Sequence, residues 1–338
     1  MTKFYATVLM AIMMSISIAF GPSGFSVAGE GIGGNPKYLD EDGDQTADLP
    51  IDPKEWINPD TLVFADPPLE DIGQDLFAEF VELLAKKTGK KVVHNVMAYN
   101  SSGIEDMRSG RLHIASFSTG ATHYAVDLAG YVPIATKGDE DGFQGYRLIV
   151  IVRSDSPYFK LQDLRGKSVA HTTPSSLSGH IAPVALLTRE GITPGTDYKV
   201  EFAGNHEKAT LGVGAGTYDG ACVGSSLFDR IAAAGEINKD DFRIIWQSGK
   251  FPTSSFGYVY NLDPDLSAKI REAFYEYRFT PEMIKIFDTD RFSPITYARD
   301  YKITRIIAES AGEKFDEEGL QKMFESDQEA AKKKAAAK

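Results

Sequence analysis

The segment His171-Thr-Thr-Pro-Ser-Ser-Leu-Ser-Gly-His-Ile-Ala-Pro183 decides how this chain is interpreted. A strand-like run, 167–170, precedes it, and an apolar run with helical spacing, 184–188, follows it. The sequence therefore predicts a strand, a hydroxyl-rich turn and the start of a helix. The first turn of a helix has unpaired backbone N–H groups and partial positive charge, so this turn suits an oxyanion. Ser176, Ser178 and the N–H groups after Gly179 are the candidate donors; the alternative is that Ser178 is an ordinary N-cap.

The rest of the chain alternates strand-like and helical patterns. Strand patterns at 61–65, 91–97 and 112–117 are separated by helical patterns at 72–87 and 102–110. This alternation argues for a parallel sheet in an α/β fold. A strongly apolar strand at 146–153 is expected to cross to a second lobe, and a strand at 257–261 is expected to return. Two crossings between lobes make a hinged cleft.

The N-terminus has the composition of a secretory signal peptide. Lys3 is followed by an apolar run, 8–20, and by Ser26-Val-Ala28, which gives a basic region, a hydrophobic region and a small-residue cleavage site. The run is short for a membrane span. We therefore expect cleavage after Ala28 and export to the periplasm, with a retained N-terminal anchor as the alternative.

Charge and cysteine content exclude several classes of protein. The formal charge of −12 argues against a nucleic-acid or anionic-membrane partner. It also requires that an anionic ligand be held by local dipoles. Cys222 is the single cysteine, so no intramolecular disulfide forms. The acidic stretch Asp40–Asp48 is expected to be solvated, with Ca²⁺ binding as the alternative; no metal or cofactor is assigned.

Two motifs give the chain a family resemblance. One is S-x-S-G-x-x-x-P, at Ser176–Pro183, and the other is G-x-H-E, at Gly204–Glu207. In this order they resemble the substrate-binding proteins of phosphate, phosphite and phosphonate ABC transporters, the PhnD-like family. The resemblance implies a two-lobe type II periplasmic-binding-protein fold, a Venus flytrap with two crossover segments. The expected division is a signal peptide at 1–28, an acidic leader at 29–59, lobe one at 60–147 plus 256–325, lobe two at 148–255, and a Lys/Ala-rich tail at 326–338.

The resemblance also implies which residues contact the ligand. Lobe two contributes the serine turn, in which Leu177 replaces a hydroxyl residue and retains only its backbone N–H, and the imidazole of one histidine. Lobe one contributes tyrosine and Ser/Thr hydroxyl groups. The expected ligand-binding residues are Tyr99, Ser118, Thr119, Tyr146, Ser176, Leu177, Ser178, His206 and Ser254.

Two expected acidic positions are replaced by serine. Relatives that take aminoalkyl phosphonates place carboxylates against the ligand amine, and here Ser226 and Ser254 align with them. An ammonium group buried without a counter-charge is costly, so we expect a ligand that lacks an amine. A shift in this alignment could instead hide a carboxylate such as Asp229.

The resemblance implies transport and not catalysis. We expect a monomer that delivers phosphonate, phosphite or phosphate to an ABC permease and its ATPase. Ser178 lacks the preceding glycine of a nucleophile elbow, and the histidines lack metal-ligand spacing. The alternatives are an oxyanion-binding accessory to a membrane sensor and, further from the pattern, a Ser/His hydrolase.

Overall fold

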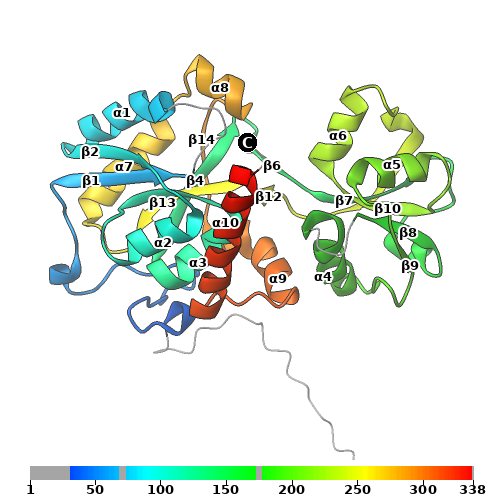
Figure 1. Ribbon diagram of the computed structural model, residues 1–338, viewed down its shortest axis with the longest axis horizontal. Coiled ribbons are helices and arrows are strands. Elements are labelled where there is room, and N and C mark those ends of the chain that lie inside the picture. Colours follow the sequence, from blue (N-terminus) through cyan, green and yellow to red (C-terminus); the bar gives the residue numbers. More distant parts are fainter. Residues whose placement is uncertain (1–30, 68–73, 173–176, 337–338) are drawn as a thin grey trace, which may run out of the picture.

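The computed structural model describes residues 31–67, 74–172 and 177–336, and they form two α/β lobes (Figure 1). The predicted signal peptide and Ser176 lie outside the described residues. Lobe one is built on a seven-stranded sheet in the order β14-β4-β13-β3-β1-β2, with β5 paired to β4. Its strands are β1 (Thr61–Asp66), β2 (Lys91–Val96), β3 (Ile114–Ser118), β4 (Tyr131–Asp139), β5 (Gly142–Phe143), β13 (Ser254–Val259) and β14 (Arg291–Pro294).

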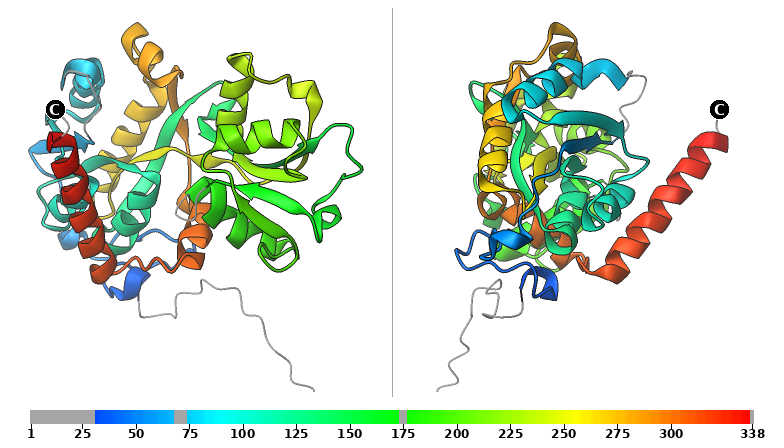
Figure 2. Two further views of the ribbon diagram at one scale, coloured as in Figure 1. Left: turned by 45° about the vertical axis from the view of Figure 1, so that its right-hand side comes forward. Right: turned by 90° about the vertical axis from the view of Figure 1, so that its left-hand side faces the viewer.

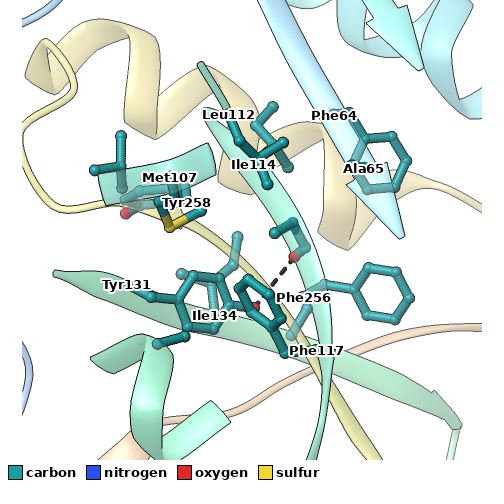
Figure 3. Close-up of a cluster of buried hydrophobic side chains, with 14 of the residues drawn as sticks. Phe64, Ala65, Met107, Leu112, Ile114, Phe117, Tyr131, Ile134, Phe256 and Tyr258 are labelled. Atoms are coloured by element: carbon teal, nitrogen blue, oxygen red, sulfur yellow. Dashed lines mark hydrogen bonds between the residues drawn. The ribbon is translucent and has the colours of Figure 1, made fainter. Parts of the chain in front are cut away.

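Helices cover the sheet of lobe one and enclose its core. They are α1 (Ala78–Thr88), α2 (Asn100–Arg108), α3 (Thr119–Ala129), α7 (Pro264–Glu276) and α8 (Pro281–Phe287). In α1, Phe80, Leu84 and Thr88 recur every four residues on the buried face. The helix ends at Gly89, whose φ of 70° is left-handed. Figure 3 shows how side chains such as Phe117, Tyr131 and Phe256 from neighbouring strands fill the core.

Lobe two is smaller and has a five-stranded sheet in the order β11-β7-β10-β8-β9. Its strands are β7 (Leu148–Arg153), β8 (Ser168–His171), β9 (Lys199–Phe202), β10 (Gly220–Gly224) and β11 (Phe242–Gln247), and its helices are α4 (Ala182–Arg189), α5 (His206–Gly214) and α6 (Ser225–Ala233). β8 is parallel to both β9 and β10. The carboxyl ends of these three strands therefore meet at one edge of the sheet.

Two short strands join the lobes. β6 (Gly145–Tyr146) and β12 (Phe251–Pro252) pair antiparallel with each other as a separate two-stranded ribbon. A Cβ at Gly145 would lie 2.2 Å from the Phe251 carbonyl oxygen, so the ribbon needs glycine there. The chain thus crosses twice, and the predicted two-lobe fold with two crossover segments is confirmed.

Both lobes direct the ends of their parallel strands toward this ribbon. In lobe one, β3 is parallel to β1, and β13 is antiparallel to both β3 and β4, so β1, β3 and β4 run the same way. β4 ends just before the first crossing, and β13 begins just after the second. In α/β proteins ligands bind outside the carboxyl ends of the strands. The facing edges of the two sheets are therefore where a ligand site belongs.

A C-terminal helix, α9 (Lys302–Ser310), contacts both lobes. Ile307 is 2 % exposed and packs with the core of lobe two beside α4, whereas Arg305 binds Asp127 of α3 in lobe one through two 2.7 Å contacts. Ile303 packs close to the second crossing, because a Cβ at Gly249 would lie 2.7 Å from its Cδ1. The lobes are therefore linked by a packed helix as well as by the ribbon.

The last helix, α10 (Glu317–Ala336), lies against α2 and then leaves the body of lobe one (Figure 2, right). The Ser101 hydroxyl donates to Asp327 over 2.7 Å, and Arg108 pairs with Glu317. Within the described residues, no helix has the length and apolar character needed to cross a membrane.

Several element boundaries differ from the sequence-based expectations. The predicted helix at 72–87 begins as an α-helix only at Ala78, after a 3₁₀ turn at Gln74–Phe77. The return strand begins at Ser254, because Ser254 and Ser255 already pair with β3. The strand pairing therefore assigns Ser254 and Ser255 to the sheet of lobe one, whereas the expected range of lobe two ran to residue 255.

Candidate functional site

The serine turn of lobe two is a π-helical turn, Leu177–Ile181, that leads directly into α4. It lies against the end of β8, where the Thr172 N–H donates to the Gly179 carbonyl oxygen over 3.1 Å. A Cβ at Gly179 would lie 1.9 Å from the Thr172 hydroxyl oxygen, so this close approach requires glycine. The sequence Ser-Gly after Leu177 thus fixes the turn at the strand edge and leaves Ser178 only partly buried.

Ser178 and His206 are brought together across this edge. The Ser178 Oγ lies 3.2 Å from the His206 Nε2. His206 is the first residue of α5, whose N-cap, Asn205, accepts from the Lys208 N–H over 2.8 Å. Two helix starts, those of α4 and α5, therefore converge on one point, and each favours negative charge near its N-terminus.

The tautomer of His206 follows from its other ring nitrogen. The Gly224 N–H, at the end of β10, donates to the His206 Nδ1 over 3.3 Å. Because a backbone N–H can only donate, Nδ1 accepts and Nε2 carries the proton of the neutral ring. Burial lowers the pKa of His206, which keeps the ring neutral in the free protein. His206 thus presents an N–H donor toward Ser178 and the space beside it.

Tyr146 lies next to this pair, on the first crossover strand. Its ring packs edge-to-face on Phe251 of the second crossover strand, with centroids 5.3 Å apart. The Tyr146 Cδ2 would lie 3.9 Å from a Cβ at Gly224, the residue that orients His206. Burial raises the pKa of Tyr146, so its phenol stays protonated and can donate.

The candidate residues of lobe one gather at the opposing sheet edge. Ser118 ends β3 and lies directly opposite Ser254 at the start of β13. The Ser254 hydroxyl oxygen is enclosed and has no hydrogen-bond partner among the described residues. The Thr119 hydroxyl instead donates to the Pro252 carbonyl oxygen over 2.7 Å, which ties α3 to the second crossing.

The other positions considered from the sequence differ in their surroundings. Tyr99 precedes α2, and its ring meets Phe324 of α10 at 6.5 Å. Ser226 is exposed on α6. Asp229, the alternative acidic residue, is exposed and paired with Lys239 at 2.5 Å, so its carboxylate is already bound by a cation. Leu177 begins the serine turn, and Ser176 is outside the described residues.

One ionisable residue at the lobe-one edge was not predicted. Lys137, near the end of β4, is partly buried, and its Nζ lies 4.6 Å from the centroid of the Phe287 ring. Burial lowers its pKa, and Asp66 acts in the opposite direction. Lys137 directly follows the mainly apolar run Tyr131-Val-Pro-Ile-Ala-Thr. This position is the sequence signal that could have indicated it.

The acidic leader forms a compact loop. Asp40, Asp42 and Asp44 bring carboxylate oxygens within 4.8 Å of one another. Burial, and the charge of Asp44, raise the pKa of Asp40. The expectation of a solvated loop stays a prediction, and so does its alternative, Ca²⁺ binding by these carboxylates.

Comparison with known proteins shows the family of the chain. Residues 70–301 match the family described as ABC transporter, phosphonate, periplasmic substrate-binding protein. The chain belongs to this family. The family resemblance inferred from the two motifs is thereby confirmed, and the protein is a periplasmic substrate-binding component of an ABC transporter for phosphorus compounds.

Two curated relatives and one solved structure are similar to this chain. The phosphate-import protein PhnD of Mycolicibacterium smegmatis is 29 % identical over 231 residues, covering 64 % of this chain and 71 % of the relative. The phosphonates-binding periplasmic protein of Escherichia coli is 26 % identical over 232 residues, covering 67 % and 68 %. A TctC solute-binding protein from Polaromonas, 13 % identical with a TM-score of 0.50, covers 75 % of this chain and 96 % of its own, and shares the fold.

Proposed function

We propose that this protein captures a small phosphorus oxyanion without an amine, namely phosphonate, phosphite or phosphate, and delivers it to an ABC permease. The observation that carries the proposal is the convergence of the Ser178 hydroxyl and the His206 Nε2, 3.2 Å apart, at the starts of two helices. Both groups are uncharged donors while the His206 ring is neutral. They suit an oxyanion because helix starts carry partial positive charge.

Binding and closure are coupled in this proposal. The anion docks on lobe two, at the Ser178 turn and His206. Tyr146, on the crossing strand, is placed to donate from the hinge, and the residues of lobe one close over the ligand. The ligand then shifts the equilibrium between open and closed forms by its greater affinity for the closed form.

The hydrolase alternative is disfavoured by the same geometry. A serine nucleophile needs an adjacent base that can accept its proton. Here the Gly224 N–H occupies the His206 Nδ1, so the Nε2 facing Ser178 carries a proton and cannot accept another. The exposed Asp229 also cannot orient His206, because it pairs with Lys239.

Isothermal titration calorimetry of the mature protein tests the proposal. Methylphosphonate, phosphite and phosphate are titrated separately, with sulfate as a tetrahedral control anion. We expect one-to-one binding of at least one phosphorus oxyanion, and much weaker binding of sulfate. Absence of binding by all three phosphorus compounds, in a protein that unfolds cooperatively, would refute the proposed ligand class.

A further inference from the structure

Lys137 lies in the same lateral row of the lobe-one sheet as two residues already assigned to the site. Phe256 of β13 pairs with Ala135 of β4. Lys137 is two residues after Ala135, and Ser254 is two residues before Phe256 on the antiparallel neighbour. Side chains alternate between faces with a period of two, so Lys137 and Ser254 lie on the same face. The paired stretch ends at Phe256 and Ala135, and the same register continued by two residues places Lys137 opposite Ser254. Ser118 is the next member of this row, because it pairs with Ser254.

The row lies at the edge where the chain crosses to lobe two. β4 ends at Asp139 before the first crossing, and Ser254 follows the second crossing strand, which ends at Pro252. The edge that carries Ser178 and His206 in lobe two adjoins the same ribbon, since Tyr146 of β6 lies beside Gly224. Lys137 and Ser254 thus occupy the side of lobe one that faces the serine turn.

Within the described parts of the chain, neither polar group has a hydrogen-bond partner. The Ser254 Oγ is enclosed without a hydrogen-bond partner among the described residues. The Lys137 Nζ has the Phe287 ring as its close neighbour, and no hydrogen bond or ion pair joins it to any described residue. Asp66, whose charge acts on Lys137, is itself bound to the His94 Nε2 at 2.6 Å. A partly buried ammonium without an acceptor is costly, so its presence calls for an explanation.

We propose that Lys137 and Ser254 form the lobe-one half of the oxyanion site and contact oxygens of the phosphorus group when the lobes close. This inference rests on the proposed function and adds a cation to it. Lobe two supplies uncharged donors and helix starts, and lobe one supplies the ammonium. The site then offers a local positive charge within a protein of net charge −12. It also disfavours a ligand amine, because a ligand ammonium near Ser254 would meet the ammonium of Lys137.

The test compares the wild type and four variants by calorimetry with the phosphorus oxyanion that the wild type binds best. Lys137→Met keeps the length and apolar stem and removes the charge, whereas Lys137→Arg keeps the charge. Lys167→Met is the matched control, because the Lys167 Nζ also lies over an aromatic ring, Tyr158, at 5.4 Å. Lys167 precedes β8 and is therefore at the end of that strand remote from the serine turn.

We expect Lys137→Met to weaken binding by about tenfold or more, the effect of losing a charge-assisted hydrogen bond. Lys137→Arg should stay within about threefold of the wild type, and Lys167→Met should be unchanged. Ser254→Ala removes a hydroxyl that has no hydrogen-bond partner in the described part of the chain. It should weaken binding severalfold without lowering the melting temperature. This variant tests the proposal even where Lys137→Met fails to fold.

Three results would overturn the inference. One is a folded Lys137→Met with wild-type affinity. The second is an equal loss in Lys137→Met and Lys137→Arg, which would indicate a packing effect. The third comes from titrating Lys137→Met with methylphosphonate and with phosphonoacetate. A loss confined to phosphonoacetate would assign Lys137 to the ligand substituent and not to its phosphorus group. A wild type that binds none of the anions would instead refute the proposed function itself.

Discussion

Replacement of Ser178 by alanine tests most directly whether the serine turn binds the oxyanion. The substitution removes one hydroxyl from the π-helical turn and leaves the backbone N–H groups, Gly179 and the start of α4 in place. In the free protein the Ser178 Oγ lies 3.2 Å from the His206 Nε2, so the variant also releases that donor. The ligand would then find His206 already free but would lose one hydroxyl donor.

The size of the effect follows from these two changes. A hydrogen bond to a charged group contributes about 1.5–3 kcal/mol, and an ordinary one contributes about 1 kcal/mol. Binding in the wild type exchanges the contact between Ser178 and His206 for contacts with the anion, whereas the variant has no such contact to exchange. The net loss should therefore be about 1–2 kcal/mol, which corresponds to roughly 5- to 30-fold weaker binding.

The assay is calorimetric titration with the preferred phosphorus oxyanion, beside thermal unfolding of each protein. Ser156→Ala is the matched control, because the Ser156 hydroxyl also makes one hydrogen bond, to the Arg153 carbonyl oxygen at 2.7 Å, beyond the far end of β7. It should leave affinity unchanged. If Ser178→Ala binds as tightly as the wild type while its melting temperature is preserved, the oxyanion-turn hypothesis is wrong.

Three further predictions address the hinge, the ligand and the core. Tyr146→Phe keeps the packing on Phe251 and should weaken ligand binding by about 1 kcal/mol, measured by calorimetry. Tyr146→Ala should reduce the compaction that the ligand causes, measured by small-angle scattering. Identical scattering profiles of the free and bound wild type would contradict closure. 2-Aminoethylphosphonate should bind much more weakly than methylphosphonate, and Ser254→Asp should shift the preference toward the amine; tighter binding of the amine by the wild type would contradict this. Burial and His180 lower the pKa of the fully buried His171 to about 3, so below pH 6.5 the unfolded chain takes up a proton that the folded protein does not. Stability should then fall as the pH drops, by about 2 kcal/mol at pH 5 from this residue, and urea unfolding at pH 7 and 5 should show a smaller difference for His171→Gln; an unchanged difference would refute the assignment.

The local features of the fold were predictable from the sequence. The run before His171 and the apolar spacing after Pro183 gave the strand, the turn and the helix that the structure contains. These signals depend on neighbours within a few residues, so one sequence is sufficient to detect them. The convergence of Ser178 with His206 was predicted only through the family resemblance, because 28 residues separate them.

The remaining part of the site depends on pairing between distant strands. Ser118 and Ser254 meet because β3 and β13 pair, although 136 positions separate them in the chain. The Thr119 hydroxyl is directed to Pro252 by the position of the second crossing, which no local pattern specifies. Lys137 was missed for the same reason, since its inferred place near Ser254 depends on the register of β4 against β13.

The attachment of α9 to both lobes limits how the protein can move. Arg305 is fixed to Asp127 of α3, which begins at the lobe-one edge of the site, and Ile307 is fixed beside α4, which begins at the serine turn. A rotation of one lobe against the other must therefore slide one side of this helix across its neighbour. In the proposed closure, part of the free-energy change then comes from the packing of α9 and not from contacts with the ligand. Affinity for the ligand can change through substitutions at this surface while every residue that contacts the anion stays the same.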